Sequence, residues 1–201
     1  LPIFNLKEIK NNFSLNEEPL ILFTLHPIIK SKPNNNKKDV DEIFNSLKAL
    51  SSKYQIIVTY PNFDPGYKYI ISKINNLKKS TPKIKIIKHL GRKNYHALLR
   101  YIGKNKKGFC MGNSSSGIKE AVVFDCPTLN IGDRQKSRLK PNNVIDVDAD
   151  KEKIIRSINT KIKRKRKTKI ENPYKIKNSF NKLPKNIFKK FLREDFKLKN
   201  A

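Results

Sequence analysis

Pro19–Leu25, with the sequence PLILFTL, is the stretch that decides the fold class. An almost continuous apolar run of this length, bounded by charged residues, is typical of a strand buried on both faces, as in a parallel sheet. Tyr54–Thr59 (YQIIVT) has the same character. Between the two, Val40–Ser51 has the apolar spacing of an amphipathic helix, and the polar segment Lys30–Asp39 (KSKPNNNKKD) before it is predicted to be a loop.

The same alternation of apolar strand and amphipathic helix continues along the chain. Further strands are predicted at Ile84–Lys88, Gly108–Met111, Thr128–Ile131 and Asn143–Val147. Further helices are predicted at Tyr67–Leu77, Asn94–Ile102, Gly117–Phe124 and Lys151–Ile158. Strands that alternate with helices predict an α/β fold, with a Rossmann-like parallel sheet flanked by helices. Because parallel crossovers are right-handed, the strand-to-helix loops gather at one edge of the sheet, where ligands of such folds bind.

The composition fits one basic domain. The chain has 201 residues, 37% of them hydrophobic, and a formal net charge of +28. Such a charge favours acidic partners, whether nucleic acid, an anionic membrane or phosphorylated metabolites, although lysine-rich runs also serve simply as solvated surface. Cys110 and Cys126 are too few for a disulfide framework or a zinc site, and both lie in apolar runs, so we expect buried thiols.

Three regions are expected along the chain. Leu1 is not a methionine, and residues 1–18 are expected to be a linker from a missing N-terminal lobe. Residues 19–160 form the predicted domain, and residues 161–201 a basic tail with the run Lys161–Lys169 and an amphipathic helix over Pro184–Leu192. No signal peptide is visible, and no apolar run approaches the roughly 20 residues of a membrane span. We therefore expect a cytoplasmic protein without a membrane partner.

The segment Met111–Glu120 (MGNSSSGIKE) carries the strongest chemical signal. A strand is predicted to end at Gly112, a serine-rich turn follows, and a helix is predicted to begin near Gly117. Hydroxyl and free backbone N–H groups at the start of a helix form an anion site, which the helix dipole assists. Ser114, Ser115 and Ser116 would then meet a phosphate, Gly117 would let it approach the backbone, and Glu120 would accept hydrogen bonds from two ribose hydroxyls. The alternative is a plain helix cap, because serine is a favoured N-cap residue.

A basic segment is predicted to lie at the same edge of the sheet. IGDRQKSR (Ile131–Arg138) directly follows a strand. Its two arginines, Arg134 and Arg138, present planar guanidinium groups that are suited to gripping a diphosphate. The alternative interpretation is a basic surface loop.

Two further polar loops follow the first two strands. TLHP places His26 directly after the first buried strand, where an imidazole can donate to a phosphate or act as a general acid, unless it is a structural histidine. In YPNFDPG (Tyr60–Gly66), Asn62 and Asp64 are free to meet a ligand or to serve the turn. His89 and His96 belong to no motif and are assigned no role.

In this order, the segments TLHP, YPNFDPG, GNSSSGIKE and PTLNIGDRQKSR, with a late ENPY at Glu171–Tyr174, resemble the C-terminal domain of the hydrolysing UDP-N-acetylglucosamine 2-epimerases. The resemblance runs from about Pro19 to Tyr174. It implies the C-terminal lobe of a two-domain enzyme of the glycosyltransferase-B-like architecture, with the active site between two Rossmann-like lobes. No cofactor and no metal are implied.

The resemblance also implies roles for individual residues. The serines at 114 and 115, Glu120 and Arg134 match positions that hold UDP in the family, and Asn62 matches a position in a cleft loop. His26 matches a histidine near the diphosphate and is the expected catalytic residue. The family eliminates UDP through a glycal-like intermediate, to which water adds to give N-acetylmannosamine for sialic-acid-type sugar biosynthesis.

The resemblance implies particular partners and leaves two alternatives. The expected partners are UDP-N-acetylglucosamine or a related acetamido sugar, the missing N-terminal lobe in cis or in trans, and further copies of the full-length chain in a homo-oligomer. One alternative is the donor-binding lobe of a glycosyltransferase of the same architecture. The other is a basic nucleic-acid-binding protein, which we do not expect, because no nucleic-acid motif is present and no aromatic residues are interleaved with the basic run.

Overall fold

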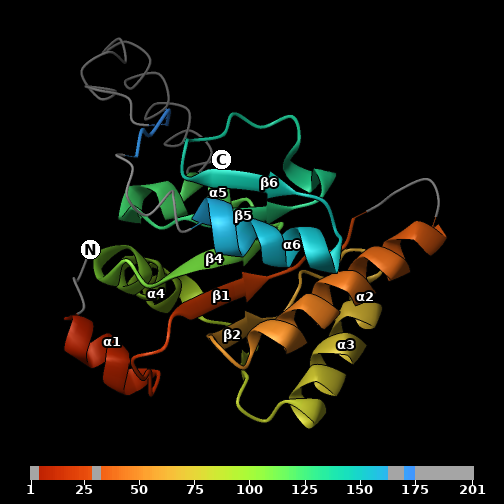
Figure 1. The fold of residues 1–201 in the computed structure, drawn as a ribbon, viewed down its shortest axis with the longest axis horizontal. Coiled ribbons are helices and arrows are strands. Elements are labelled where there is room, and N and C mark those ends of the chain that lie inside the picture. Colours follow the sequence, from red (N-terminus) through yellow and green to blue (C-terminus); the bar gives the residue numbers. More distant parts are fainter. Residues whose placement is uncertain (1–4, 29–32, 163–169, 175–201) are drawn as a thin grey trace, which may run out of the picture.

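A single parallel sheet forms the centre of the molecule (Figure 1). The structure is a computed structural model and describes residues 5–28, 33–162 and 170–174. Its six strands follow the order β3-β2-β1-β4-β5-β6, and every neighbouring pair is parallel. The strands are β1 (Leu20–Thr24), β2 (Gln55–Thr59), β3 (Lys85–Ile87), β4 (Gly108–Gly112), β5 (Thr128–Ile131) and β6 (Val144–Val147). All six predicted strands are therefore confirmed to within two residues at either end.

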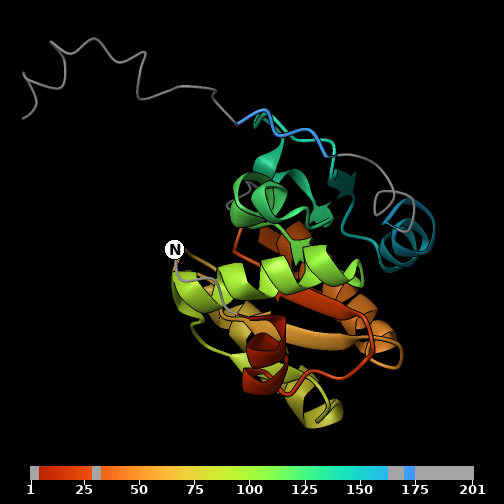
Figure 2. The same ribbon diagram turned by 90° about the vertical axis from the view of Figure 1, so that its left-hand side faces the viewer.

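Helices cover both faces of this sheet (Figures 1 and 2). The helices are α1 (Leu6–Asn12), α2 (Pro33–Leu50), α3 (Tyr67–Ser80), α4 (Gly91–Asn105), α5 (Ser116–Lys119) and α6 (Lys151–Ser157). Two 3-10 turns, Ala121–Phe124 and Asp133–Gln135, and a π-helical turn, Ile158–Ile162, complete the described elements. The predicted α/β fold with a Rossmann-like sheet is confirmed.

The sheet separates two apolar cores. Successive side chains of a strand point to opposite faces, so Ile21 and Phe23 of β1 enter one core while Leu20 and Leu22 enter the other. The first core lies under α2, α3 and α6, and the second under α4 and α1. Cys110 and Cys126 are both buried in the second core and form no disulfide, so the predicted buried thiols are confirmed.

Helices α3 and α4 extend three residues beyond a predicted end, and two larger differences have a physical reason. The segment Pro33–Asp39, predicted as loop, forms the first turns of α2. Proline suits the first turn of a helix because its fixed φ is helical and its missing N–H has no intrahelical partner there. The single helix predicted over Gly117–Phe124 is instead one α-turn followed by a 3-10 turn. The β-branched pair Val122 and Val123 gives this second part a weak helix propensity.

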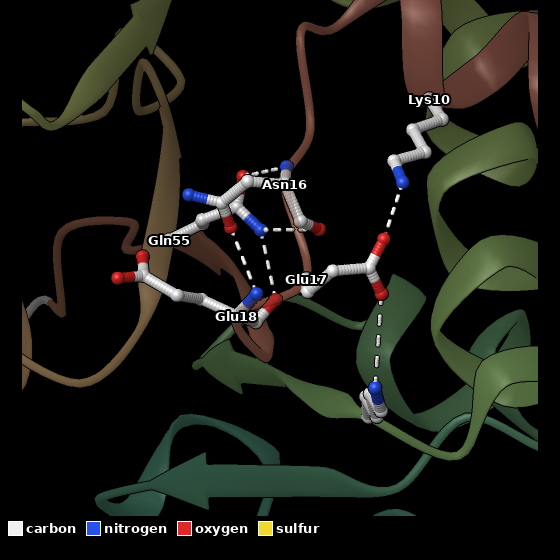
Figure 3. Close-up of polar contacts among 6 residues, drawn as sticks. Lys10, Asn16, Glu17, Glu18 and Gln55 are labelled. Carbon is white, nitrogen blue, oxygen red and sulfur yellow. Dashed lines mark hydrogen bonds and ion pairs between the residues drawn. The ribbon is translucent and has the colours of Figure 1, made fainter.

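The described N-terminal residues are packed onto the domain. Helix α1 begins with a capping box between Asn5 and Glu8 and buries Ile9 against the core under α4. Figure 3 shows how the following turn is fixed: the Gln55 amide accepts a hydrogen bond from the Asn16 N–H at 2.8 Å and donates to the Glu18 carbonyl at 2.8 Å. Residues 5–18 are thus part of the folded unit, while their service as a linker from another lobe stays a prediction.

The basic tail is described only in small part. Most of the run Lys161–Lys169 and the helix predicted over Pro184–Leu192 lie outside the described residues. The described Glu171–Tyr174 contacts the loop before β6, since Glu171 donates its N–H to Asn142 Oδ1 at 3.0 Å and the Tyr174 hydroxyl donates to the Leu139 carbonyl. Within the described ranges, no helix has both the length and the apolarity that crossing a bilayer requires.

Candidate functional site

The candidate site lies where the strand order reverses. From β1 the chain adds β2 and β3 on one side of the sheet, and it then crosses to the other side to add β4, β5 and β6. The loops after β1 and β4 therefore diverge and leave a crevice between them. Gly112 ends β4 directly beside Thr24 of β1, with a φ of 128°. A Cβ at Gly112 would lie 1.9 Å from the Thr24 carbonyl oxygen, so only glycine fits this position.

The crevice opens into a cleft of about 620 Å³. Its described lining residues are Thr24, His26, Thr59, Tyr60, Lys88, His89, Leu90, Gly91, Arg92, Tyr95, His96, Ser114, Ser116 and Glu120. Among them Lys88 and Arg92 are cationic, and Glu120 is the one carboxylate. A concave surface with these charges attracts an anion, and its single carboxylate can accept hydrogen bonds from a ligand.

Asn113 joins three of the loops that surround this cleft. Its side chain is fully buried and pairs with the backbone of His26 in both directions, accepting from its N–H at 2.7 Å and donating to its carbonyl at 2.9 Å. The Asn113 carbonyl in turn accepts hydrogen bonds from Arg134 Nη1 at 3.3 Å and Gln135 Nε2 at 2.9 Å. The loops after β1, β4 and β5 therefore form one hydrogen-bonded unit.

His26 is half-buried at the mouth of the cleft, and its tautomer follows from its contacts. Its Nδ1 accepts a hydrogen bond from the Asn62 backbone N–H at 3.1 Å, so the proton of the neutral ring lies on Nε2. Burial, and next the positive charge of Arg134, lower the pKa of His26. The ring is therefore a neutral N–H donor near pH 7, and a bound anion would raise its pKa again.

The serine segment is organised by a chain of hydroxyl groups. Tyr95 of α4 lies 2.7 Å from Ser116 Oγ, and Ser116 Oγ lies 2.8 Å from Ser114 Oγ. Burial raises the pKa of Tyr95 well above its ordinary value, so the phenol keeps its proton and can donate it to Ser116. If Ser116 in turn donates to Ser114, the Ser114 hydroxyl proton is left for an acceptor in the cleft.

Glu120 lies at the end of α5, half-exposed, and its carboxylate contacts a histidine that has no place in any motif. Glu120 Oε2 is 2.6 Å from His96 Nε2. The His96 ring lies in tilted contact with Phe124, with the ring centroids 5.1 Å apart. One carboxylate oxygen is thus held by α4, and the other has no hydrogen-bond partner among the described residues.

Comparison with known proteins gives the family. The family model for UDP-N-acetylglucosamine 2-epimerases matches residues 3–187. This chain belongs to that family. Among solved structures, it is similar to the Methanocaldococcus jannaschii UDP-GlcNAc 2-epimerase in complex with UDP-GlcNAc and UDP, with a TM-score of 0.61 and 21% identity over 85% of this chain and 45% of that one. It is also similar to Staphylococcus aureus MnaA with UDP, with a TM-score of 0.55 and 15% identity over 79% and 42% of the two chains. These likenesses confirm the fold.

Two curated relatives are named as hydrolysing 2-epimerases. The chain is 35% identical over 131 residues to a GDP/UDP-N,N'-diacetylbacillosamine 2-epimerase (hydrolyzing) of Campylobacter jejuni, which covers 65% of this chain and 32% of the relative. It is 33% identical over 144 residues to a UDP-N,N'-diacetylbacillosamine 2-epimerase (hydrolyzing) of Legionella pneumophila, covering 69% and 34%. The chain therefore spans about a third of the length of these epimerases.

Five of the predicted site residues, including Arg134, do not line this cleft. Ser115 is half-buried but does not line the cleft, and Arg138 is exposed outside it. Gly117, predicted to admit a phosphate, is buried instead, and a Cβ there would lie 3.0 Å from Thr128 Cγ2, so this glycine lets α5 pack on β5. Asn62 supports His26 through its backbone N–H rather than facing the cleft.

Helix α5 is too short to place a strong dipole at the cleft. This helix has four residues, Ser116–Lys119, so few peptide dipoles are aligned toward the cleft. The hydroxyls of Ser114 and Ser116 and the guanidinium of Arg134 are then the stronger partners for an anion. Arg134 is bound to the Asn113 carbonyl beside this segment, although it is not itself among the lining residues.

Residues of α4 were missed by the sequence analysis. Tyr95 and His96 contact Ser116 and Glu120 across 21 and 24 positions of sequence, and no local pattern marks them. Asn113 and Gln135 lie inside the motifs GNSSSG and GDRQ, so their place in these motifs could have marked them as site residues. The described residues contain no group of three or more His, Cys, Asp or Glu that could hold a metal ion.

Proposed function

We propose that this chain is the UDP-binding, C-terminal half of a hydrolysing UDP-sugar 2-epimerase. The observation that carries the proposal is the convergence of Ser114, Ser116, Glu120 and His26 on one basic cleft at the switch point of the sheet. These groups suit a nucleoside diphosphate, since hydroxyl and imidazole N–H groups can donate to phosphate and a carboxylate can accept from ribose. Relatives named as hydrolysing 2-epimerases support the same reaction class.

The proposed binding mode assigns each group a part of UDP. The diphosphate lies against Ser114 and Ser116, with His26 Nε2–H and Arg134 on its other side. Glu120 accepts hydrogen bonds from the ribose hydroxyls through its free oxygen. Lys88 and Arg92, both exposed at the rim, raise the local concentration of the nucleotide through their charge.

The proposed reaction is an elimination followed by a hydration. A base removes the proton from sugar C2, the C1–O bond breaks, and UDP leaves with the bonding electron pair, which gives a glycal-like intermediate. Water then adds across the C1–C2 double bond to give the free epimerised sugar, N-acetylmannosamine when the substrate is UDP-N-acetylglucosamine. His26 and Arg134 would stabilise the negative charge that develops on the leaving diphosphate.

The C2 base is proposed to come from elsewhere than this cleft. Glu120 is the one carboxylate among the described lining residues, and it is engaged by His96. Asp64 is engaged in its own turn, since it accepts from Asn62 Nδ2 at 2.5 Å and its carbonyl accepts from the Tyr67 N–H. A second, N-terminal lobe, in cis or in trans, would supply the base and most sugar contacts, and the complete enzyme would be a homo-oligomer. The acetamido sugar would then be selected mainly by that lobe.

Two measurements test this proposal. Calorimetry should detect UDP binding to the 201-residue chain, and no binding of uridine at the same concentration, because the phosphate contacts are lost. The chain alone should release no UDP from UDP-N-acetylglucosamine, and should do so once joined to the N-terminal lobe of a family member, with free N-acetylmannosamine as the product. Transfer of the sugar to an acceptor would favour a glycosyltransferase instead, and robust turnover by the chain alone would refute the proposed division of labour.

A further inference from the structure

Two consecutive residues of helix α4 bind the serine segment that lines the cleft. Tyr95 contacts Ser116, and His96 contacts Glu120, so one turn of α4 holds two side chains of the segment Ser114–Glu120. This segment otherwise has little to fix its side chains, because α5 is a single turn and its N-cap makes no side-chain hydrogen bond. The conformation of the groups that would receive UDP is therefore set from outside the motif.

The contact between His96 and Glu120 has the geometry of a positioning interaction. The Glu120 side chain is 43% exposed, which would leave it free to sample several rotamers, whereas the His96 side chain is only 18% exposed. His96 is itself fixed by its ring contact with Phe124. A well-packed donor thus holds a more exposed acceptor at 2.6 Å.

The direction of the hydrogen bond follows from the chemistry of the two groups. An ionised carboxylate only accepts, so His96 Nε2 must carry the proton that points at Glu120 Oε2. This leaves Glu120 Oε1 as the acceptor for a ligand. A carboxylate fixed by one oxygen and open at the other is arranged to receive hydroxyl donors from the cleft.

We propose that His96 is a positioning residue that holds Glu120 in the rotamer that receives the ribose hydroxyls of UDP. The inference rests on the proposed function, and it assigns to His96 an effect on ribose recognition without one on the diphosphate, which is bound at the other end of the segment. Removing the His96 donor should therefore weaken the binding of UDP more than that of 2'-deoxy-UDP, which offers Glu120 only its 3'-hydroxyl.

The variants separate the hydrogen bond from the bulk of the ring. In His96→Gln the amide nitrogen stands about where Nε2 of histidine stands, so this variant keeps the donor. His96→Phe keeps the ring against Phe124 but has no donor, and His96→Asn has a donor too short to reach Glu120. Lys104→Gln is a matched control, because Lys104 is an exposed residue of α4 that does not line the cleft.

Binding of UDP and 2'-deoxy-UDP to the full chain is measured by calorimetry. A hydrogen bond to a charged group corresponds to roughly ten-fold or more in affinity, so we expect the wild type, His96→Gln and Lys104→Gln to prefer UDP by about that factor. In His96→Phe, His96→Asn and Glu120→Gln the preference should fall toward one, and His96→Phe should add nothing to Glu120→Gln in the double variant. Circular dichroism checks that each variant is folded.

Each possible result of these measurements supports or overturns the role of His96. Absence of UDP binding by the wild type overturns both the proposed function and the role of His96. Binding by the wild type with an unchanged preference in His96→Phe and His96→Asn overturns the role of His96 alone. An equal loss of both nucleotides also overturns it, because His96 would then support the whole cleft rather than the ribose contact. Should His96→Phe fail to fold, the contrast between His96→Gln and His96→Asn decides in the same way.

Discussion

Replacement of Asn113 by alanine should destabilise the chain and weaken UDP binding together. The substitution removes two hydrogen bonds, of 2.7 and 2.9 Å, and leaves the N–H and carbonyl of His26 without these partners. At about 1 kcal/mol for each bond, and more where a partner stays buried and unpaired, the loss of unfolding free energy is about 2–4 kcal/mol. A domain of ordinary stability, about 5–15 kcal/mol, remains folded after this loss.

Asn143→Ala is the matched control for this prediction. Asn143 is also buried, and its side chain donates one hydrogen bond, to the Cys126 carbonyl at 2.7 Å, away from the cleft. Chemical unfolding followed by circular dichroism should show a smaller loss for Asn143→Ala, about 1–2 kcal/mol, and calorimetry should show unchanged UDP affinity. Asn113→Ala should bind UDP roughly ten-fold more weakly, since His26 is no longer fixed. Equal effects of the two substitutions on stability and binding would refute the idea that Asn113 positions His26.

Three further predictions concern the anion site and are checked by calorimetry with UDP. Ser114→Ala should weaken binding by about 1 kcal/mol and Ser115→Ala by less, because only Ser114 lines the cleft; the reverse order would contradict the assignment. Arg134→Lys should bind UDP more weakly than wild type, because one ammonium cannot reproduce a bidentate guanidinium contact, and equal affinity would exclude Arg134 from the site. The pKa of His26 is lowered in the free chain and should rise beside a bound diphosphate, so binding takes up a proton. The affinity of the wild type relative to His26→Gln should therefore increase as the pH falls from about 7.5 to 5.5, a comparison that cancels the titration of UDP itself, and a constant ratio would count against this role.

The strands were predictable because their signal is local. PLILFTL and YQIIVT are apolar runs that a strand buried on both faces requires, and the observed β1 and β2 lie within them. The first turns of α2 were not predictable from apolar spacing, because Pro33–Asp39 contains no apolar residue other than Pro33. Helical structure there depends on propagation from the amphipathic part of the helix that follows.

The site was predictable only where its residues lie in motifs. His26 and Ser114 each follow a strand at the switch edge, so topology alone brings them together. Tyr95 and His96 reach the same cleft from the middle of a helix, and their role depends on how α4 packs on the sheet. Gly117 shows the converse, since a glycine within a motif serves the packing of α5 on β5 rather than a ligand.

The hydrogen-bond pattern of the cleft bears on why a second lobe would be needed. Asn113 holds His26, Tyr95 holds Ser116, and His96 holds Glu120, so the proposed nucleotide contacts are fixed before any ligand arrives. Such preorganisation favours binding, but the one carboxylate of the described lining is committed to His96. Proton removal at sugar C2 needs a free base in fixed geometry, and a misplacement of about 1 Å can cost about a hundred-fold in rate. A lobe that closes over the cleft would supply that base and also exclude water, which strengthens the interactions of His26 and Arg134 with the leaving diphosphate.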